Sequence, residues 1–200
     1  MSSSFPLRLG VLGSGKGSNF EFLAQAARSK SCYYDPVMVL SDVADAGILK
    51  LADQFKIRSR FIEPGPFKTK LTEAMEQEIV AYLQAAEVDF IALAGFMRVI
   101  KAPLLKAFPG RILNIHPSLL PRFPGLAAWK QACEAHVTET GCTVHLVDEG
   151  IDTGKILGQS RVPIFPEDTP ATVHMRIQHA EHELYPRIVN EFARAISGSF

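Results

Sequence analysis

The sequence predicts an α/β fold with an open, mostly parallel, Rossmann-like sheet flanked by helices. As far as residue 116, strand-like apolar segments alternate with helical segments, which is typical of parallel strands joined by crossover helices. The segment 88–94 is almost continuously apolar, as in a strand buried on both faces. Later in the chain, strand-like segments 143–147 and 156–162 have too short a connection for a crossover helix, which favours an antiparallel strand in the C-terminal half.

The individual elements follow from the spacing of apolar residues. Segments with strand composition and segments with helical spacing alternate in the first half. The strands are expected at 7–12, 36–40 and 88–94, and the helices at 19–28, 46–55 and 69–86. A further strand is expected at 112–116, and a closing helix at 169–196, which Pro186 should kink or divide. We expect a single domain over residues 1–200.

Composition excludes several classes of protein. Lys and Arg together number 21, as do Asp and Glu, so net charge gives no reason to expect a nucleic-acid or membrane-surface partner. The three cysteines form no CxxC pair, which indicates neither a zinc site nor a disulfide framework. No apolar run approaches the roughly 20 residues of a membrane span. We therefore expect a cytoplasmic protein without a bound metal.

The strand at 112–116 carries the chemically most informative pair of residues. Asn114 and His116 are two positions apart and project from the same face of this strand. Pro117 ends the strand, which places both side chains near its carboxyl end, where open parallel sheets bind ligands. An amide and an imidazole there can both donate to one oxygen, as stabilisation of an oxyanion requires.

Asp152, in the sequence Asp-Thr-Gly, is the expected third member of this site. A carboxylate arriving from another strand end could orient the imidazole of His116 and handle a proton. A turn-forming role is the alternative for Asp152. The combination of an amide, an imidazole and a carboxylate favours acyl or formyl transfer, in which no enzyme nucleophile is needed.

A glycine-rich loop follows the first strand. Gly13, Gly15 and Gly17 allow a tight turn and close approach of a ligand to the backbone. The helix that begins after them offers free amides to an anion, and Ser18 and Asn19 add side-chain donors. The loop lacks the P-loop pattern and matches GxGxxG poorly, so we favour a phosphomonoester, while an ordinary helix N-cap remains the equal alternative.

Four motifs together resemble those of the folate-dependent formyltransferases. They are GKGSN at 15–19, AGFMR at 94–98, NIHPSLLP at 114–121, and GCTVH at 141–145 followed by DTG at 152–154. Their order, their spread over most of the chain and the chain length are similar to those of phosphoribosylglycinamide formyltransferases. The NIHPSLLP motif is specific for the chemistry, whereas the glycine loop with GFMR points to the purine enzymes.

This resemblance implies transfer of a formyl group from the co-substrate 10-formyltetrahydrofolate to the amine of glycinamide ribonucleotide. It also implies a nucleotide half of about residues 1–100 and a folate-binding and catalytic half of about 101–200. The implied catalytic residues are Asn114, His116 and Asp152; those for the substrate phosphate are Gly17, Ser18, Asn19 and Lys70; Glu181 contacts the nucleotide; and Phe96, Met97, Arg98, Ile100 and Asp148 border the folate. A monomer or a homodimer is expected.

Some positions depart from the family pattern or keep two interpretations. Lys70 stands where family members often carry an arginine, so it keeps the charge but loses the forked geometry. His145 is either a residue that faces the site or a hydrogen-bonded structural one. Among the histidines of the last helix, His174 and His182 are two turns apart, too far for one metal ion.

Three other functions compete with this one. A methionyl-tRNA formyltransferase is expected to have a further carboxyl-terminal domain, and a formyltetrahydrofolate hydrolase an amino-terminal regulatory domain. A dinucleotide-binding module would use Asp42, after the second strand, as its ribose ligand. That module would leave Asn114, His116 and Asp152 without a purpose.

Overall fold

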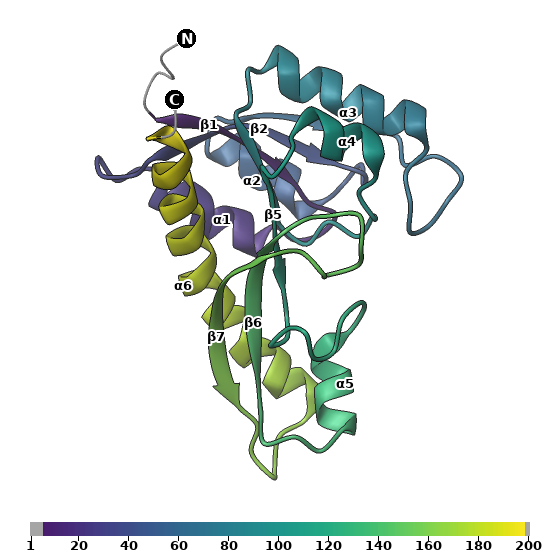
Figure 1. Ribbon diagram of the computed structural model, residues 1–200, viewed down its shortest axis with the longest axis vertical. Helices are drawn as coiled ribbons and strands as arrows, with labels where there is room; N and C mark the ends of the chain where they lie inside the picture. Colours follow the sequence, from purple (N-terminus) through teal and green to yellow (C-terminus); the bar gives the residue numbers. More distant parts are fainter. Residues whose placement is uncertain (1–5, 199–200) are drawn as a thin grey trace.

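The computed structural model describes residues 6–198 and contains a seven-stranded sheet with the strand order β3-β2-β1-β4-β5-β6-β7 (Figure 1). The strands are β1 (Leu7–Leu12), β2 (Tyr34–Ser41), β3 (Arg58–Phe61), β4 (Phe90–Leu93), β5 (Ile112–His116), β6 (Glu139–Leu146) and β7 (Ile156–Pro163). The helices are α1 (Ser18–Ala26), α2 (Gly47–Gln54), α3 (Glu73–Ala85), α4 (Ala102–Ala107), α5 (Ala128–Glu134) and α6 (Pro170–Ser197).

The sheet has a parallel part and an antiparallel part. Strands β3, β2, β1, β4 and β5 pair in parallel, whereas β6 runs antiparallel to both β5 and β7. The predicted fold class is therefore confirmed, including the antiparallel strands of the C-terminal half. Because β5 is the last parallel strand, its carboxyl end lies where the pairing of neighbouring strands changes from parallel to antiparallel.

Helices cover both faces of the sheet. One apolar cluster joins α1, α2 and α6 to one face, and Phe20, Ile48 and Ile177 are fully buried in it. A second cluster joins α3 and α4 to the opposite face, with Ile79 and Leu104 in its interior. Figure 1 shows α6 running obliquely across β6 and β7, with its first turns near α5. Loops, and not helices, directly follow the carboxyl ends of β1, β4 and β5.

Three elements were not expected from the sequence. Strand β3 is exposed at every position and lies at the edge of the sheet, so its residues lack the apolar alternation that reveals a half-buried strand. Helices α4 and α5 have six and seven residues, which is too short for an apolar period to repeat clearly. Each is held by tertiary contacts, because isolated helices of this length are not stable.

Helix α6 continues through Pro186 as one helix, so of the two predicted outcomes, a kink or a division, division does not occur. A proline inside a helix removes one hydrogen bond to the carbonyl four residues earlier. Buried residues on both sides of it offset this loss: Tyr185 and Val189 are fully buried, and the Tyr185 hydroxyl donates to the carbonyls of Leu93 and Leu113 in the sheet. Within residues 6–198, no helix has both the length and the apolar character needed to cross a membrane.

Candidate active site

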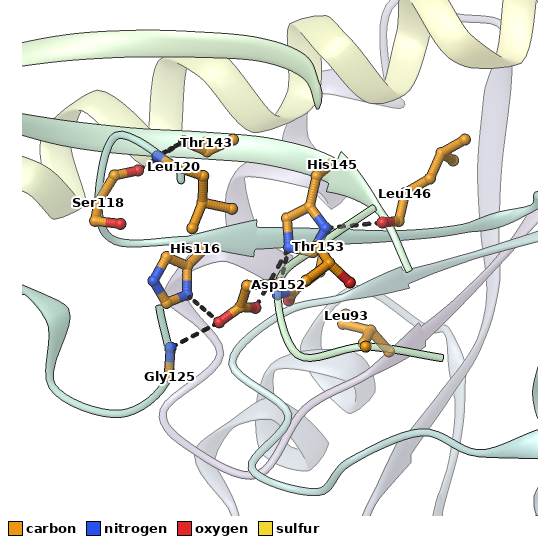
Figure 2. A network of polar contacts seen from close by, with 12 residues as sticks. Leu93, His116, Ser118, Leu120, Gly125, Thr143, His145, Leu146, Asp152 and Thr153 are labelled. Atoms are coloured by element: carbon orange, nitrogen blue, oxygen red, sulfur yellow. Dashed lines mark hydrogen bonds and ion pairs between the residues drawn. The ribbon is translucent and has the colours of Figure 1, made fainter. Parts of the chain in front are cut away.

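The three predicted catalytic residues meet at the carboxyl end of β5. Asn114 and His116 lie on β5, and Asp152 lies in the loop between β6 and β7. Antiparallel pairing sets Asn114 opposite His145 of β6. Figure 2 shows the Asp152 carboxylate between the rings of His116 and His145. These side chains meet in the folded chain because β6 runs back alongside β5 as its antiparallel partner.

The distances describe one connected polar cluster. Asp152 Oδ2 is 3.3 Å from His116 Nδ1, and Asp152 Oδ1 is 3.5 Å from His145 Nε2. Asn114 Nδ2 is 3.2 Å from His145 Nε2. The amide of Gly125 donates to Asp152 Oδ2 at 2.8 Å. Asp152 thus contacts every part of the cluster except Asn114, which is joined to it through His145.

The backbone fixes the tautomer of His145. Its Nδ1 lies 2.8 Å from the Leu146 carbonyl oxygen, which can only accept, so Nδ1 carries the proton. In the neutral ring, Nε2 is then an acceptor, and Asn114 donates one of its two amide hydrogens to it. The second amide hydrogen of Asn114 remains for another acceptor. His145 therefore faces the site and is also hydrogen-bonded to the backbone, so the two interpretations of this residue combine.

His116 is held from both sides of its ring. Its Nε2 donates to the Phe123 carbonyl at 2.9 Å, and its Nδ1 faces Asp152. The hydroxyl of Ser118 donates to the carbonyls of Arg122 and Phe123, which fixes the acceptor of the His116 hydrogen bond. In this arrangement the imidazole of His116 is not free to donate to a substrate oxygen until its Nε2 leaves Phe123.

Burial and hydrogen bonding shift the pKa values of this cluster. Burial lowers the pKa of His116, although the Phe123 carbonyl and the Asp152 carboxylate oppose this. For Asp152, burial alone would raise the pKa. The contact with His145, the hydrogen bond from the Gly125 amide and the electrostatic effect of both imidazoles outweigh burial and lower it. At neutral pH Asp152 is therefore an ionised carboxylate.

The loop that carries Asp152 is shaped by its own side chains. Asp148 Oδ1 accepts from the Gly150 amide at 3.0 Å and from the Thr153 hydroxyl at 2.7 Å. Asp152 has a φ of 56°, a left-handed conformation that is uncommon outside glycine but tolerated by aspartate. The structure thus gives Asp148 a loop-forming contact, with its carboxylate turned toward the loop.

A cavity of about 240 Å³ opens beside this cluster. Its walls come from the segment after β5 and from the loop between β6 and β7. The lining residues are Leu120, Pro121, Pro124, Ile151, Asp152, Thr153, Gly154 and Ile156. Because most of these are apolar and one is the clustered carboxylate, the cavity suits an apolar organic group with a polar atom near Asp152.

The glycine loop lies at the same end of the sheet. In the register of the sheet, Leu12 pairs with Leu93, and Leu93 pairs with Asn114. The loop after β1 is therefore two strands, or about 10 Å, from the catalytic amide. Gly17 precedes α1 with a φ of 85°, and a Cβ there would meet the Cα of Ile48 at 2.7 Å. Only glycine fits this turn.

Asn19 and Glu181 form a second buried polar pair. Asn19 Nδ2 donates to Glu181 Oε2 at 3.0 Å, which joins α1 to α6. Burial raises the pKa of Glu181 to about 7, although the hydrogen bond from Asn19 partly opposes it. Asn19 Oδ1 is buried and has no hydrogen-bond donor among the described residues. An unsatisfied buried acceptor is costly, and a donor on a substrate would satisfy it.

The residues predicted to border the folate have different surroundings. Met97 is 55% exposed, and its amide donates to the Ser14 hydroxyl of the glycine loop. Phe96 is partly buried against the second cluster, and Ile100 is 5% exposed within it, so the structure gives the Ile100 side chain a place in the core. The Arg98 guanidinium is bound to Asp42 and the Phe67 carbonyl.

Lys70 and two histidines of α6 lie against aromatic rings. The Lys70 ammonium lies 4.1 Å from the centre of the Phe67 ring. His174 stacks on Trp129, and His182 stacks on Phe22. In the part of the chain that the structure describes, no group of three His, Cys, Asp or Glu side chains could hold a metal ion.

Several site groups could not be expected from the sequence. The Gly125 amide and the Phe123 carbonyl are backbone groups, and side-chain patterns do not indicate them. Thr143 is a side chain that was missed: its Oγ1 donates to the Ser118 carbonyl at 2.6 Å and accepts from the Leu120 amide at 3.0 Å (Figure 2). Its position on the same strand as His145 was the available signal.

Comparison with known proteins connects this geometry to a family. The model of the formyl transferase family matches residues 7–189. The phosphoribosylglycinamide formyltransferase of Bacillus subtilis is 41% identical over 184 residues, which cover 92% of this chain and 93% of that protein. The crystal structure of glycinamide ribonucleotide transformylase 1 from Symbiobacterium toebii is 41% identical with a TM-score of 0.90, covering 94% of this chain and 88% of that one.

A longer relative matches as well. The trifunctional purine biosynthetic protein adenosine-3 of Drosophila pseudoobscura pseudoobscura is 47% identical over 182 residues, or 90% of this chain. The chain spans only 13% of that protein's length. The similarity therefore concerns one part of the trifunctional protein and nearly all of the Bacillus subtilis enzyme.

Proposed function

The chain belongs to the formyl transferase family, and from this we propose that it transfers the formyl group of 10-formyltetrahydrofolate to the amine of glycinamide ribonucleotide, a step of purine biosynthesis. The observation that carries the proposal is the convergence of Asn114, His116 and Asp152 in one cluster beside a cavity, about two strand spacings from the glycine loop. The names of the relatives support the choice of substrates.

In the proposed reaction the substrate amine attacks the formyl carbon directly. A carbon–nitrogen bond forms, and the formyl oxygen becomes an alkoxide in a tetrahedral intermediate. The free amide hydrogen of Asn114 donates to this oxygen, and His116 donates to it once its Nε2 has left the Phe123 carbonyl. The bond from the formyl carbon to the folate nitrogen then breaks.

Asp152 has two tasks in this proposal. Its carboxylate, with a lowered pKa, stabilises the imidazolium form of His116 while the negative charge develops. It also accepts the amine proton, directly or through a water, and passes it toward the folate nitrogen that leaves. No enzyme nucleophile is required, because the amine is itself the nucleophile.

We assign the glycine loop to the phosphate of the ribonucleotide. The amides at the start of α1 and the turn at Gly17 support this assignment, with Lys70 as a nearby cation. The unsatisfied Asn19 Oδ1 and the buried Glu181 carboxyl would bind the sugar or amide groups between the phosphate and the amine. The cavity beside Asp152 would receive the ring end of the folate. A cytoplasmic location and a monomeric or homodimeric state complete the proposal.

The test is a spectrophotometric assay with glycinamide ribonucleotide and 10-formyldideazafolate. We expect Asn114→Ala to lower kcat by about 10²- to 10³-fold, because one donor to the oxyanion is lost. Asp152→Asn should lower kcat by about 10²- to 10⁴-fold, because the proton acceptor is lost.

Asp35→Asn is the matched control for Asp152→Asn, because Asp35 is an exposed carboxylate on β2. Circular dichroism establishes that each variant is folded. Release of formate without any need for the ribonucleotide would point to a hydrolase, and unchanged turnover in Asp152→Asn would refute the catalytic assignment.

A further inference from the structure

Thr143 is a fully buried residue of β6, and its hydroxyl has every hydrogen-bonding position filled. It pairs with His116 of β5 in the register of the sheet. Its Oγ1 donates to the Ser118 carbonyl at 2.6 Å and accepts from the Leu120 amide at 3.0 Å. It also accepts from Nε2 of Gln159 at 2.9 Å. A hydroxyl has one hydrogen and two lone pairs, so Thr143 makes all the hydrogen bonds that it can.

Gln159 of β7 completes this network from the neighbouring strand. It pairs with Thr143 across the antiparallel part of the sheet. Besides Thr143, its Nε2 donates to the Leu120 carbonyl at 2.9 Å. A carbonyl oxygen only accepts, and the Thr143 hydroxyl already donates its hydrogen to Ser118, so both contacts require a donor on Gln159. The network therefore fixes which end of the Gln159 amide faces Leu120.

This network holds a segment that forms one wall of the cavity. Both backbone groups of Leu120 are bound, the amide by Thr143 and the carbonyl by Gln159. Leu120 and Pro121 line the cavity together with Asp152. Leu120 is 5% exposed, so removal of the Thr143 hydroxyl would leave its amide as a buried donor without an acceptor. The position of this wall therefore depends on side chains of β6 and β7.

The same segment fixes the hydrogen bond of His116. The Ser118 hydroxyl donates to the Phe123 carbonyl at 3.2 Å. This carbonyl lies 2.9 Å from His116 Nε2, and His116 Nδ1 lies 3.3 Å from Asp152 Oδ2. Thr143 holds the backbone of Ser118 through its carbonyl (Figure 2). An unbroken series of contacts therefore connects Thr143 with the catalytic cluster.

We propose that Thr143 and Gln159 are positioning residues for the folate side of the site: they fix the segment 118–121 and, through it, the cavity wall and the acceptor of the His116 hydrogen bond. This inference rests on the proposed function, in which the cavity receives the ring end of the folate. Loss of the network should weaken the use of the folate. Binding of the ribonucleotide phosphate should not change, because the glycine loop follows β1, which is two strands away from β5.

The experiment measures kcat and KM for each substrate separately. Thr143→Val keeps the branched side chain but removes its three hydrogen bonds. We expect kcat/KM for 10-formyldideazafolate to fall about 10- to 10²-fold, because small displacements of the groups around a reacting atom are costly. KM for glycinamide ribonucleotide should change by less than about twofold. Thr143→Ser keeps the hydroxyl, so it should retain at least about a third of the original kcat/KM.

Thr140 is a matched control on the same strand. It is 1% exposed, and its Oγ1 is buried and has no hydrogen-bond partner among residues 6–198. Thr140→Val is therefore the same substitution without the loss of a hydrogen bond, and it should leave the kinetic constants for both substrates unchanged. Equal kcat/KM values for Thr143→Val and Thr140→Val would overturn the proposal. A defect in Thr143→Ser as large as that in Thr143→Val would also overturn it.

A second variant keeps the proposal testable if Thr143→Val does not fold. Gln159 is exposed on β7, and Gln159→Met should lower kcat/KM for the folate analogue about threefold or more; no change would contradict the proposal. If the unaltered protein does not formylate glycinamide ribonucleotide, the proposed function is wrong. If it does, and these variants impair the use of both substrates equally, only the positioning role is refuted.

Discussion

At the scale of single residues, backbone groups decide the protonation of the site. The Leu146 carbonyl places the His145 proton on Nδ1, and the Phe123 carbonyl places a proton on Nε2 of His116. His145 therefore accepts from Asn114 and orients its amide. The Asp152 carboxylate contacts both imidazoles, and its pKa is lowered. It can therefore stabilise a positive charge on either ring.

Glu181 gives a prediction for stability. Burial raises its pKa to about 7, whereas in the unfolded chain it titrates near its usual value of about 4.3. Between these values the native state binds more protons than the unfolded state, so the free energy of unfolding falls as pH rises through this window. The loss is at most about 4 kcal/mol.

The measurement compares the unaltered protein with Glu181→Gln in urea between pH 4.5 and 8. The glutamine variant should lack this part of the pH dependence and should be the more stable of the two above pH 7. Glu183→Gln is the control, because Glu183 is an exposed carboxylate two positions along the same helix, with 76% of its side chain exposed. Parallel curves for the unaltered protein and Glu181→Gln would contradict the expectation.

At the scale of elements, α1 is aligned by the turn that precedes it. Gly17 adopts a φ of 85°, and the Ile48 backbone of α2 fills the space in which a side chain would lie. The start of α1 is thus set by contact with α2. The alternative in which this segment is only a helix N-cap receives little support, because no side chain caps the helix at Gly17.

Gly17→Ala tests the importance of this turn. A Cβ would strain the left-handed backbone and push α1 away from Ile48, so we expect KM for the ribonucleotide to rise at least about tenfold and stability to fall by about 1–3 kcal/mol. Gly15→Ala is the matched control in the same loop, because a Cβ at Gly15 meets no atom within 4 Å. Equal effects of the two substitutions would argue against the role assigned to the turn.

Helix α6 joins parts of the site that are distant in the sequence. Its Tyr185 hydroxyl donates to the carbonyls of Leu93 on β4 and of Leu113 on β5, and Leu113 directly precedes Asn114. One turn earlier, Glu181 binds Asn19 of α1. A single helix, which Pro186 does not interrupt, therefore connects the part that we propose for the phosphate with the strand that carries Asn114.

At the scale of the whole molecule, the continuous sheet connects the two sequence halves. Strand β4 of the first half pairs with β5 of the second, and the apolar cluster around α6 contains residues of β1, β4, β5 and β6. The site lies across this junction. We therefore expect the halves predicted from the sequence to behave as one cooperative unit.

Urea unfolding followed by two probes tests this cooperativity. Trp129, the single tryptophan of the sequence, lies on α5 and reports on the second half by fluorescence. Far-ultraviolet circular dichroism reports on the helices of both halves. The two transitions should coincide within error, whereas a fluorescence transition that precedes loss of the circular dichroism signal would mean that the second half unfolds separately.

The sequence by itself determined the fold class and the chemistry-bearing residues of the cluster. Alternating apolar segments predict the parallel sheet, and the spacing of Asn114 and His116 on one strand predicts their common face, because both signals are local. Asp152 could be added because its motif resembles that of a known family.

Only the tertiary structure decided how these groups are used. It brings in the Gly125 amide and the Phe123 carbonyl, which no side-chain pattern indicates, and it turns the Arg98 guanidinium toward Asp42, which is 56 positions away in the sequence. The physical reason is that the partners of a buried polar group are chosen by what the packed backbone brings within hydrogen-bond distance, and that proximity is a property of the folded chain.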